Sequence, residues 1–289
     1  MNYHQFKKKI VIELKGYLPQ RYAEWKLELR EVPKVNGYMD GIHLMPKEGS
    51  GASPTIYVED LYEYYRECKS MTKVCQKAAS VFVVGVDYAA YLDTVTAMEL
   101  PKQQIVYCLV NAEKNPRLLE NAPHRMVLDM ALIYRVVLFH DDEGVNSTII
   151  THDLAEHLGL TEEELYLLAE DNTPRVLPAA VYCQEESFAI LTNQYKLLGS
   201  TVMLYSGELK SIAEQLDADL FVLPSSIHEV FLIPANGQSI TDMNHTMIEA
   251  NQTLIPPEDV LENHVYFYDR DRDMLGIPVE LPDFFGEES

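Results

Sequence analysis

The chain has 289 residues, 47% of them hydrophobic, and a formal net charge of −22. Such a chain can bury one large core or two ordinary ones, so its composition excludes an intrinsically disordered protein. It has no apolar run of the roughly 20 residues that span a bilayer, and its N-terminus lacks the continuous apolar core of a signal peptide. We therefore expect a cytoplasmic protein that does not bind membranes. In a reducing compartment its cysteines are expected to be free thiols: Cys68, Cys75, Cys108 and Cys183.

The charge is distributed unevenly. Residues 1–140 contain 18 Lys+Arg and 16 Asp+Glu, whereas residues 141–289 contain 5 and 29. The acidic half should repel phosphates, so we expect no direct binding of nucleic acid. Two interpretations fit: a solvated surface that keeps the protein soluble, or a face that docks on a basic protein or a nucleic-acid-binding complex. The change in charge predicts a near-neutral lobe at 1–140 and an acidic lobe at 141–289, with the boundary within 140–185.

The N-terminal half mixes helical and strand patterns. Apolar residues recur every three or four positions at 3–18, whereas Trp25, Leu27 and Leu29 alternate with polar residues, as in a half-buried strand. The Gly/Ser-rich stretch 47–54 lacks the Lys-Ser/Thr ending of a phosphate-binding loop, which favours a plain loop. The expected elements are helices at 3–18, 71–91 (with 81–86 open between helix and strand) and 115–119, and strands at 25–29, 41–45, 55–58, 104–110 and 126–138.

The C-terminal half contains recognisable helix starts. Thr161 and Glu164 have the spacing of a capping box, and Ser206 and Ser239 each precede a helical pattern. Pro174 is expected to end the helix that Thr161 begins. The expected elements are helices at 151–159, 161–172, 206–216 and 239–251, and strands at 147–150, 188–191, 201–205, 220–223, 227–233, 264–268 and 275–281.

These elements predict the fold class. Residues 205–234 have the pattern of a helix, a buried strand, a tight turn and a second strand, which is a suitable nucleus for an α+β layer. We therefore expect an α+β protein with mixed or largely antiparallel sheets, packed helices and two lobes.

Two acidic motifs admit more than one interpretation. Residues 155–171 have the spacing of a helix-turn-helix, but the second helix carries no Lys or Arg, which favours a structural helical hairpin over DNA binding. Its acidic side chains form the expected interaction face for a basic partner: Glu162, Glu163, Glu164 and Asp171. Asp269, Asp271, Asp273 and Glu280 have spacings similar to those of an EF-hand loop. Met274 stands where that loop needs glycine, so a charged β-turn is favoured.

Two groups of residues are candidates for chemistry. Asp242, His245 and Glu249 are three and four positions apart, so one helical face could present them to a metal ion. Ser226, His228 and Glu229 have the residue types of a hydrolase triad, but neighbouring strand residues point to opposite faces. Structural roles are favoured for both groups over chemistry, and no metal or other cofactor is expected.

Several segments resemble an uncharacterised bacterial domain-of-unknown-function family. They are PHRMVLDMALIYRV (123–136), LTEEELYLLAEDNTPRVLP (160–178), FAILTNQYKLLGS (188–200), FVLPSSIHEVFLIP (221–234) and IPPEDVLENHVYFYDR (255–270). The resemblance covers most of the chain, and the SSIHEV segment is its most specific part. It implies one shared architecture in a bacterial or bacteriophage cytosolic setting, and it implies no activity or catalytic residue.

Three functions therefore stand beside one another. The first is an interaction or regulatory protein whose acidic half docks on a basic partner. The second is a metal-assisted hydrolase that uses Asp242 and His245 with His228 or His264. The third is a structural subunit of a larger assembly. No nucleophile, base and oxyanion site can be assembled from the sequence, so the first is preferred.

Overall fold

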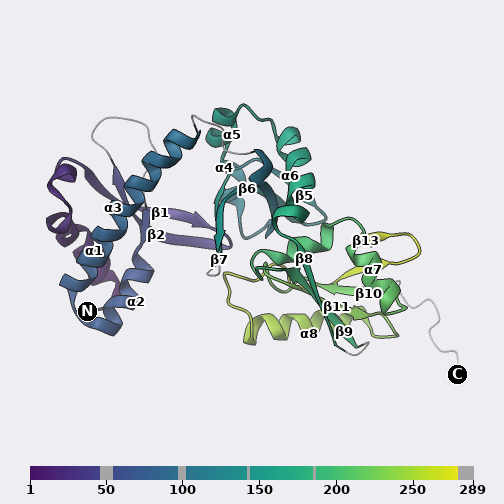
Figure 1. The fold of residues 1–289 in the computed structure, drawn as a ribbon. Coiled ribbons are helices and arrows are strands. Elements are labelled where there is room, and N and C mark those ends of the chain that lie inside the picture. Colours follow the sequence, from purple (N-terminus) through teal and green to yellow (C-terminus); the bar gives the residue numbers. More distant parts are fainter. Residues whose placement is uncertain (46–54, 97–101, 142–143, 185–186, 279–289) are drawn as a thin grey trace, which may run out of the picture. The chain divides into compact units, whose positions relative to one another are not determined.

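A computed structural model describes residues 1–45, 55–96, 102–141, 144–184 and 187–278 (Figure 1). The chain forms two compact units, Met1–Leu100 and Pro101–Ser289. The charge of the sequence changes near residue 140, whereas the boundary between the compact units lies between Leu100 and Pro101. The two positions differ because strand pairing continues across residue 140: the strand that ends at Asp141 pairs with the strand that begins at Gly144. The Gly/Ser stretch 47–54 lies outside the described residues.

The first unit packs helices against a small antiparallel sheet. Its strand order is β1 (Lys26–Lys34), β2 (Gly37–Met45), β3 (Thr55–Tyr57), and its helices are α1 (Tyr3–Leu14), α2 (Val58–Cys68) and α3 (Met71–Thr96), with 3-10 turns η1 (Lys15–Tyr17) and η2 (Gln20–Tyr22). Phe6, Ile10 and Leu14 are fully buried, one helical turn apart, which confirms the amphipathic helix expected at the N-terminus. The region left open at 81–86 is helical, within α3.

The second unit begins with a four-stranded antiparallel sheet. Its strands are β4 (Ile105–Asn111), β5 (His124–Val127), β6 (Met130–Asp141) and β7 (Gly144–Ile149), joined by η3 (Lys102–Gln104), α4 (Pro116–Asn121), α5 (His152–Leu158) and α6 (Glu162–Val176). The long strand β6 pairs with β4, β5 and β7. The apolar stretch 126–138 is therefore a strand pair, one of the two forms expected.

Helix α6 continues past Pro174, so the expected end of the helix before this residue is wrong. Asn172 and Thr173 are buried and tie the last turn to β4. The Asn172 amide donates to the Ile105 carbonyl, and the Thr173 hydroxyl accepts from the Tyr107 N–H. These tertiary hydrogen bonds offset the one that proline removes.

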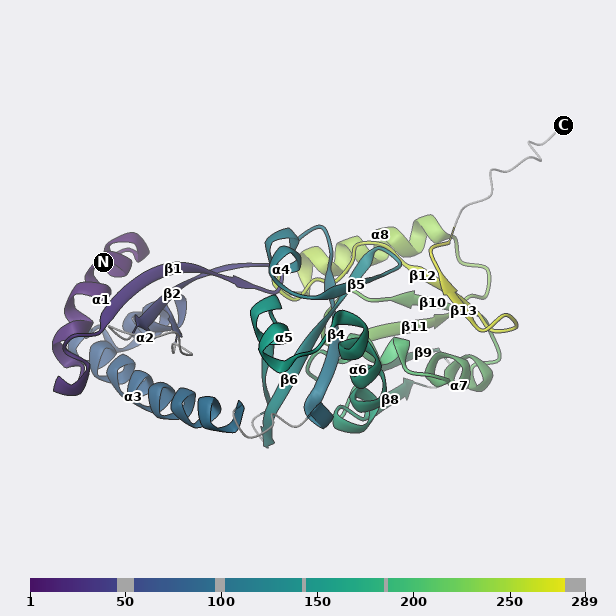
Figure 2. The same ribbon diagram turned by 90° about the horizontal axis from the view of Figure 1, so that it is seen from above.

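A six-stranded antiparallel sheet completes the second unit. Its strand order is β13 (Met274–Gly276), β12 (Tyr266–Asp269), β10 (Leu220–Leu223), β11 (Val230–Pro234), β9 (Phe188–Asn193), β8 (Ala179–Gln184), and its other elements are η4 (Gly199–Leu204), α7 (Glu208–Gln215) and α8 (Ile240–Thr253). Helix α8 lies along one face of this sheet, where Met247 packs with Phe221, Leu223 and Val265 (Figure 2).

Two local expectations in this region are wrong. Residues 201–205 are not a strand, because Gly199–Leu204 forms a 3-10 helix in which the Thr201 hydroxyl accepts from Leu109 of β4. Ser206 does not cap α7, whose N-cap is Gly207 at φ 81°. The pattern of helix, buried strand and second strand is confirmed, since α7 precedes the antiparallel pair β10 and β11.

The protein therefore has the α+β fold that the sequence predicts, and every strand pair among the described residues is antiparallel. In the described part of the chain no helix has the length and apolar character needed to cross a membrane.

Candidate functional site

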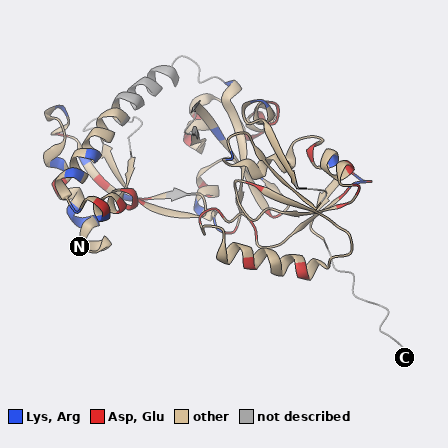
Figure 3. Ribbon diagram, turned by 60° about the horizontal axis from the view of Figure 1, so that its bottom comes forward, with Lys and Arg blue, Asp and Glu red and all other residues tan. Residues whose placement is uncertain are grey.

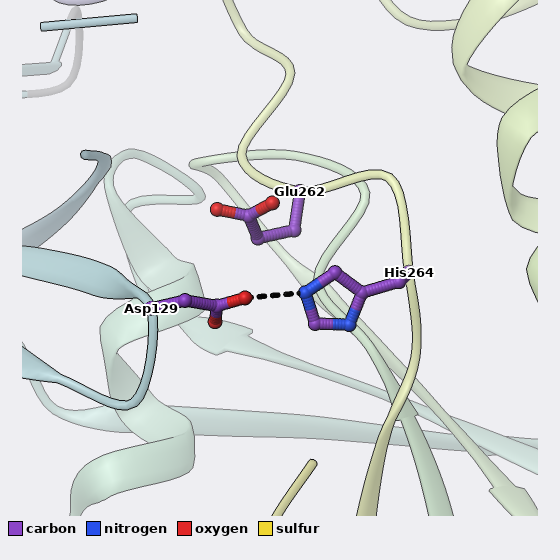
Figure 4. Close-up of side chains that lie close together, drawn as sticks. All are labelled: Asp129, Glu262 and His264. Atoms are coloured by element: carbon purple, nitrogen blue, oxygen red, sulfur yellow. Dashed lines mark hydrogen bonds and ion pairs between the residues drawn. The ribbon is translucent and has the colours of Figure 1, made fainter. Parts of the chain in front are cut away.

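Three side chains capable of binding a metal ion converge in the second unit. Asp129, Glu262 and His264 each offer one ligand atom, and these atoms lie within 4.8 Å of one another. Figure 4 shows the three side chains pointing toward one another from two separate segments. We call these three residues the acidic–histidine cluster. It is the one group of this kind found among the described residues.

Asp129 lies in the turn of the hairpin between β5 and β6. Val127 pairs with Met130, so Leu128 and Asp129 form the two-residue connection. Leu128 takes the left-handed backbone conformation, at φ 56°, which a tight hairpin turn requires. The two strands therefore fix the place from which the Asp129 carboxylate reaches the other two ligands.

Glu262 and His264 lie on the segment that leads from Val260 into β12. This segment is held by backbone and side-chain hydrogen bonds, since the Glu262 N–H donates to the Pro224 carbonyl and the Asn251 amide donates to the Glu262 carbonyl, at 3.1 and 2.7 Å. The Val265 N–H donates to the Asn244 side chain at 2.8 Å. Helix α8 and the end of β10 thus position both ligands.

Each member of the cluster is also held by a second partner. Asn111 donates to Glu262 Oε1 at 2.9 Å, and the Tyr266 hydroxyl donates to Asp129 Oδ1. His264 Nδ1 lies 3.2 Å from the Val265 carbonyl, so this nitrogen carries a proton. His264 Nε2 then faces Asp129 Oδ2 at 2.6 Å. A histidine that donates through one nitrogen and offers the other to a cation is the usual arrangement in metal sites.

Burial makes Glu262 an unusual carboxylate. Its exposed fraction is 8%, and burial followed by the charge of Asp129 raises its pKa to about 7. Burial alone would lower the pKa of His264, but the hydrogen bonds to Asp129 and to the Val265 carbonyl raise it above the ordinary value. Burial opposes the shift of Asp129, yet hydrogen bonds from Tyr266 and His264 lower its pKa. The cluster therefore has two carboxylates around one titratable cation.

Such a cluster favours a bound cation. Two carboxylates and an imidazole are ligands that Zn²⁺, Mn²⁺ and Fe²⁺ accept. A divalent ion would compensate the buried charge of Glu262 and replace the proton shared by His264 and Asp129.

Ser226 and His228 lie close together, but the serine hydroxyl contacts the backbone of His228 and not its ring. The Ser226 hydroxyl accepts from the backbone N–H of His228 at 3.0 Å. His228 Nδ1 accepts from the Leu198 N–H, and Nε2 donates to Asp259 at 3.2 Å. Both ring nitrogens are therefore engaged away from the serine hydroxyl, and the ring ties three chain segments together.

The backbone around His228 is packed closely. A Cβ atom on Gly199 would lie 2.5 Å from the His228 carbonyl oxygen, so only glycine fits there. The Thr192 hydroxyl donates to the same carbonyl at 2.7 Å. Glu229 immediately precedes β11 and is partly exposed. These contacts support a structural role for Ser226 and His228, in which their hydrogen bonds hold neighbouring loops together.

The metal candidates on α8 do not converge with other ligands. Asp242, His245 and Glu249 are all exposed on this helix, and none belongs to the group of close ligand atoms found in the described residues. Figure 3 shows acidic positions and no basic ones along α8.

The expected interaction face lies on α6, and part of it is already paired. Arg125 donates to both oxygens of Glu162, at 3.1 and 3.0 Å, and to Glu163 at 2.6 Å. Glu164 accepts from the N–H and the hydroxyl of Thr161, which confirms the capping box. Asp171 is exposed.

The acidic repeat near the C-terminus forms the turn between β12 and β13. Asp269 pairs with Met274 across this hairpin, which confirms the charged β-turn, and Glu280 lies outside the described residues.

One signal in the sequence points to the acidic–histidine cluster. Glu262 and His264 are two positions apart, a spacing that places side chains on one side of an extended chain.

The protein thus combines an antiparallel α+β fold with a cluster of two carboxylates and a histidine. The chain belongs to the family described as "Family of unknown function (DUF5688)", whose model matches residues 3–186 and 182–270. The family resemblance expected from the sequence is thereby confirmed. No curated protein and no solved structure matches the chain significantly.

Proposed function

We propose that the protein is a metal-assisted hydrolase whose divalent metal ion is held by Asp129, Glu262 and His264. The observation that supports this is the convergence of three ligand atoms within 4.8 Å from segments far apart in the chain. The sequence suggested a metal-assisted hydrolase with its ligands on the exposed face of α8. We keep this reaction type but place the metal at the acidic–histidine cluster, of which only His264 was a candidate in the sequence.

The number of ligands favours catalysis over a structural role. Structural zinc sites use four protein ligands, whereas catalytic sites use three and keep a position for water. A metal ion held by Asp129, Glu262 and His264 would lower the pKa of a bound water and so supply a nucleophile for an ester or phosphoester at neutral pH. Hydrolysis there would consume one water molecule for each bond broken, and the leaving group would take up a proton.

Metal content is the first test. Protein purified without chelator should contain about one transition-metal ion per chain, measured by elemental mass spectrometry. Glu262→Gln and His264→Ala should lose this metal and weaken Zn²⁺ or Mn²⁺ binding by at least ~100-fold in calorimetry, because each removes a direct ligand. The matched controls are Glu249→Gln and His245→Ala on α8, which should bind metal like the unaltered protein. Equal loss in the controls, or no stoichiometric metal in any sample, contradicts the proposal.

Activity is the second test. The metal-loaded protein should hydrolyse bis(p-nitrophenyl) phosphate or p-nitrophenyl acetate, and the rate should disappear with chelator and return with metal. If the protein binds metal at the cluster but cleaves neither compound, the proposed metal site is supported and the proposed hydrolase activity is refuted.

A second candidate is the docking of a basic partner on the acidic second unit. Residues 1–100 contain 13 Lys+Arg and 13 Asp+Glu, whereas residues 101–289 contain 10 and 32, so this unit carries the entire net charge. Arg125 pairs with both Glu162 and Glu163, but the Glu163 side chain stays 65% exposed, so the face available for docking is Glu163, Glu164 and Asp171. Neutralising these three side chains should weaken capture of a basic protein and reduce its salt dependence. Unchanged capture and salt dependence contradict docking.

A further inference from the structure

A second candidate site lies beside α6. It is a cavity of about 290 Å³, close to the lower end of the ~300–1,000 Å³ range of small-molecule sites. Its walls come from β4, β5, β6, α6, the end of η4 and the segment that follows it: Tyr107, Arg125, Val127, Leu132, Tyr166, Glu170, Pro174, Leu204, Tyr205 and Ser206. None of these residues belongs to the acidic–histidine cluster.

Tyr107 provides the observation that points to a ligand. Its side chain lines the cavity, although only 4% of the residue is exposed. Its backbone N–H donates to Thr173, whereas its hydroxyl has no hydrogen-bond partner within the described parts of the chain. Burial, and then the neighbouring Tyr166 and Glu170, raise the pKa of Tyr107. The hydroxyl therefore stays neutral and is available to accept from a donor in the cavity.

The other tyrosines are held in place by the protein. The Tyr205 hydroxyl donates to the Leu177 carbonyl at 3.0 Å, and the Tyr166 hydroxyl donates to Glu170 at 3.0 Å. The Arg125 guanidinium lies 3.9 Å from the centre of the Tyr166 ring. Arg125 thus makes a cation–π contact with Tyr166 in the cavity wall. Aromatic sites recognise ammonium groups by the same type of interaction.

The charge around the cavity also favours a cation. The positive charge of Arg125 is compensated by its ion pairs with Glu162 and Glu163. Glu170 lines the cavity, and Glu208 lies close enough to contribute to the raised pKa of Tyr205, after burial and Tyr107. Glu170 and Glu208 therefore add negative charge that Arg125 does not compensate, and an anionic ligand would be repelled.

We propose that this cavity binds a small organic ammonium ion. The ammonium group donates to the Tyr107 hydroxyl and the Glu170 carboxylate, and its apolar part packs against Leu132, Pro174 and the tyrosine rings. The small volume favours a free amine over a folded partner. The proposal is independent of the metal site.

Calorimetric titration of the full-length protein with 2-phenylethylamine tests the proposal, with 2-phenylethanol as the uncharged probe of similar shape. The amine should bind saturably at pH 7, and the alcohol at least tenfold more weakly. Tyr107→Phe and Glu170→Gln should each weaken amine binding by about tenfold, because each removes one acceptor. Glu249→Gln, which alters an exposed carboxylate on α8, serves as the matched control and should not change the affinity.

Three results would overturn the proposal: no saturable amine binding, equal binding of the alcohol, or unchanged affinity in both cavity variants. A fourth comparison uses a capped lysine tripeptide. Binding of the peptide without binding of the free amine identifies a docking site for a protein and refutes a small-molecule site. The amine should bind His264→Ala normally, so failure of the metal proposal and failure of this one are distinguishable.

Discussion

The two units each contain a tyrosine that donates to a partly buried aspartate beside a glutamate. In the first unit the Tyr3 hydroxyl lies 2.8 Å from Asp40 Oδ2 and 2.6 Å from Glu59 Oε1, so its one proton is shared between two carboxylate acceptors. In the second unit the Tyr266 hydroxyl donates to Asp129 near Glu262. The two groups thus begin from the same residue types.

They differ in the cation that completes them. Lys7 pairs with Asp40 in the first unit, whereas His264 pairs with Asp129 in the second. Lysine keeps its charge at neutral pH and offers donors only, so the first group has its own cation without a bound metal ion. Histidine titrates near neutral pH and binds metals through its nitrogen. The comparison teaches that the identity of one cation separates a structural ion pair from a candidate metal site.

The pH dependence of stability should show the largest difference between the units. The folded-state pKa of Glu262 is about 7, above its ordinary value of 4.5, so the folded protein binds this proton more tightly than the unfolded chain. Without metal, the second unit should therefore lose about 3 kcal/mol of stability as pH rises from 4.5 to 7. Glu262→Gln should remove most of this loss, because the amide does not titrate.

Urea unfolding in the presence of chelator checks this prediction. Circular dichroism follows both units, and fluorescence of the single tryptophan, Trp25, follows the first unit alone. The fluorescence transition should be the same in Glu262→Gln and the unaltered protein. An equally steep pH dependence of the second unit in the variant would show that Glu262 is not its source.

The two tyrosines provide a matched pair of variants. Tyr266→Phe removes the hydrogen bond that orients Asp129 and should weaken metal binding by about 10- to 100-fold. Tyr3→Phe removes the equivalent hydroxyl in the first unit and should leave metal binding unchanged. It should instead lower the stability of the first unit by about 1 kcal/mol. Calorimetric titration with Zn²⁺ separates them, and equal affinities in the two variants would break the comparison.

Replacing Lys7 tests whether its ion pair with Asp40 stabilises the first unit. Lys7→Met should destabilise the first unit by about 1–2 kcal/mol, because it leaves the Asp40 carboxylate, whose side chain is 15% exposed, without its cation. Lys9→Met is the control, since Lys9 and its partner Glu13 are both well exposed. It should change stability by less than about 0.5 kcal/mol in Trp25 fluorescence. A similar loss in both variants would mean that Lys7 has no special role.

Local patterns predicted much of the fold. The spacing of Phe6, Ile10 and Leu14 predicted α1, and Thr161 with Glu164 predicted the start of α6. These elements follow from interactions within one or two turns, which are present in the sequence itself. Pro174 misled the prediction because its helix is held by hydrogen bonds to β4.

The candidate sites were harder to predict. His228 was a catalytic candidate by residue type, and only the tertiary structure shows that its ring nitrogens bond to the Leu198 N–H and to Asp259. The candidates on α8 satisfied a helical spacing, but that spacing places side chains on one face without deciding whether the face meets another ligand.

By itself, the sequence determined the charge asymmetry and an α+β fold with mixed or largely antiparallel sheets, because counts and local periodicity carry that information. The family was indicated by the resemblance of whole segments. Only the tertiary structure decided which ionisable groups meet. Asp129 and His264 are 135 positions apart and come together because the β5–β6 hairpin meets the segment before β12. Burial there then raises the pKa of Glu262, an effect that depends on the surrounding atoms and not on the neighbouring residues in the chain.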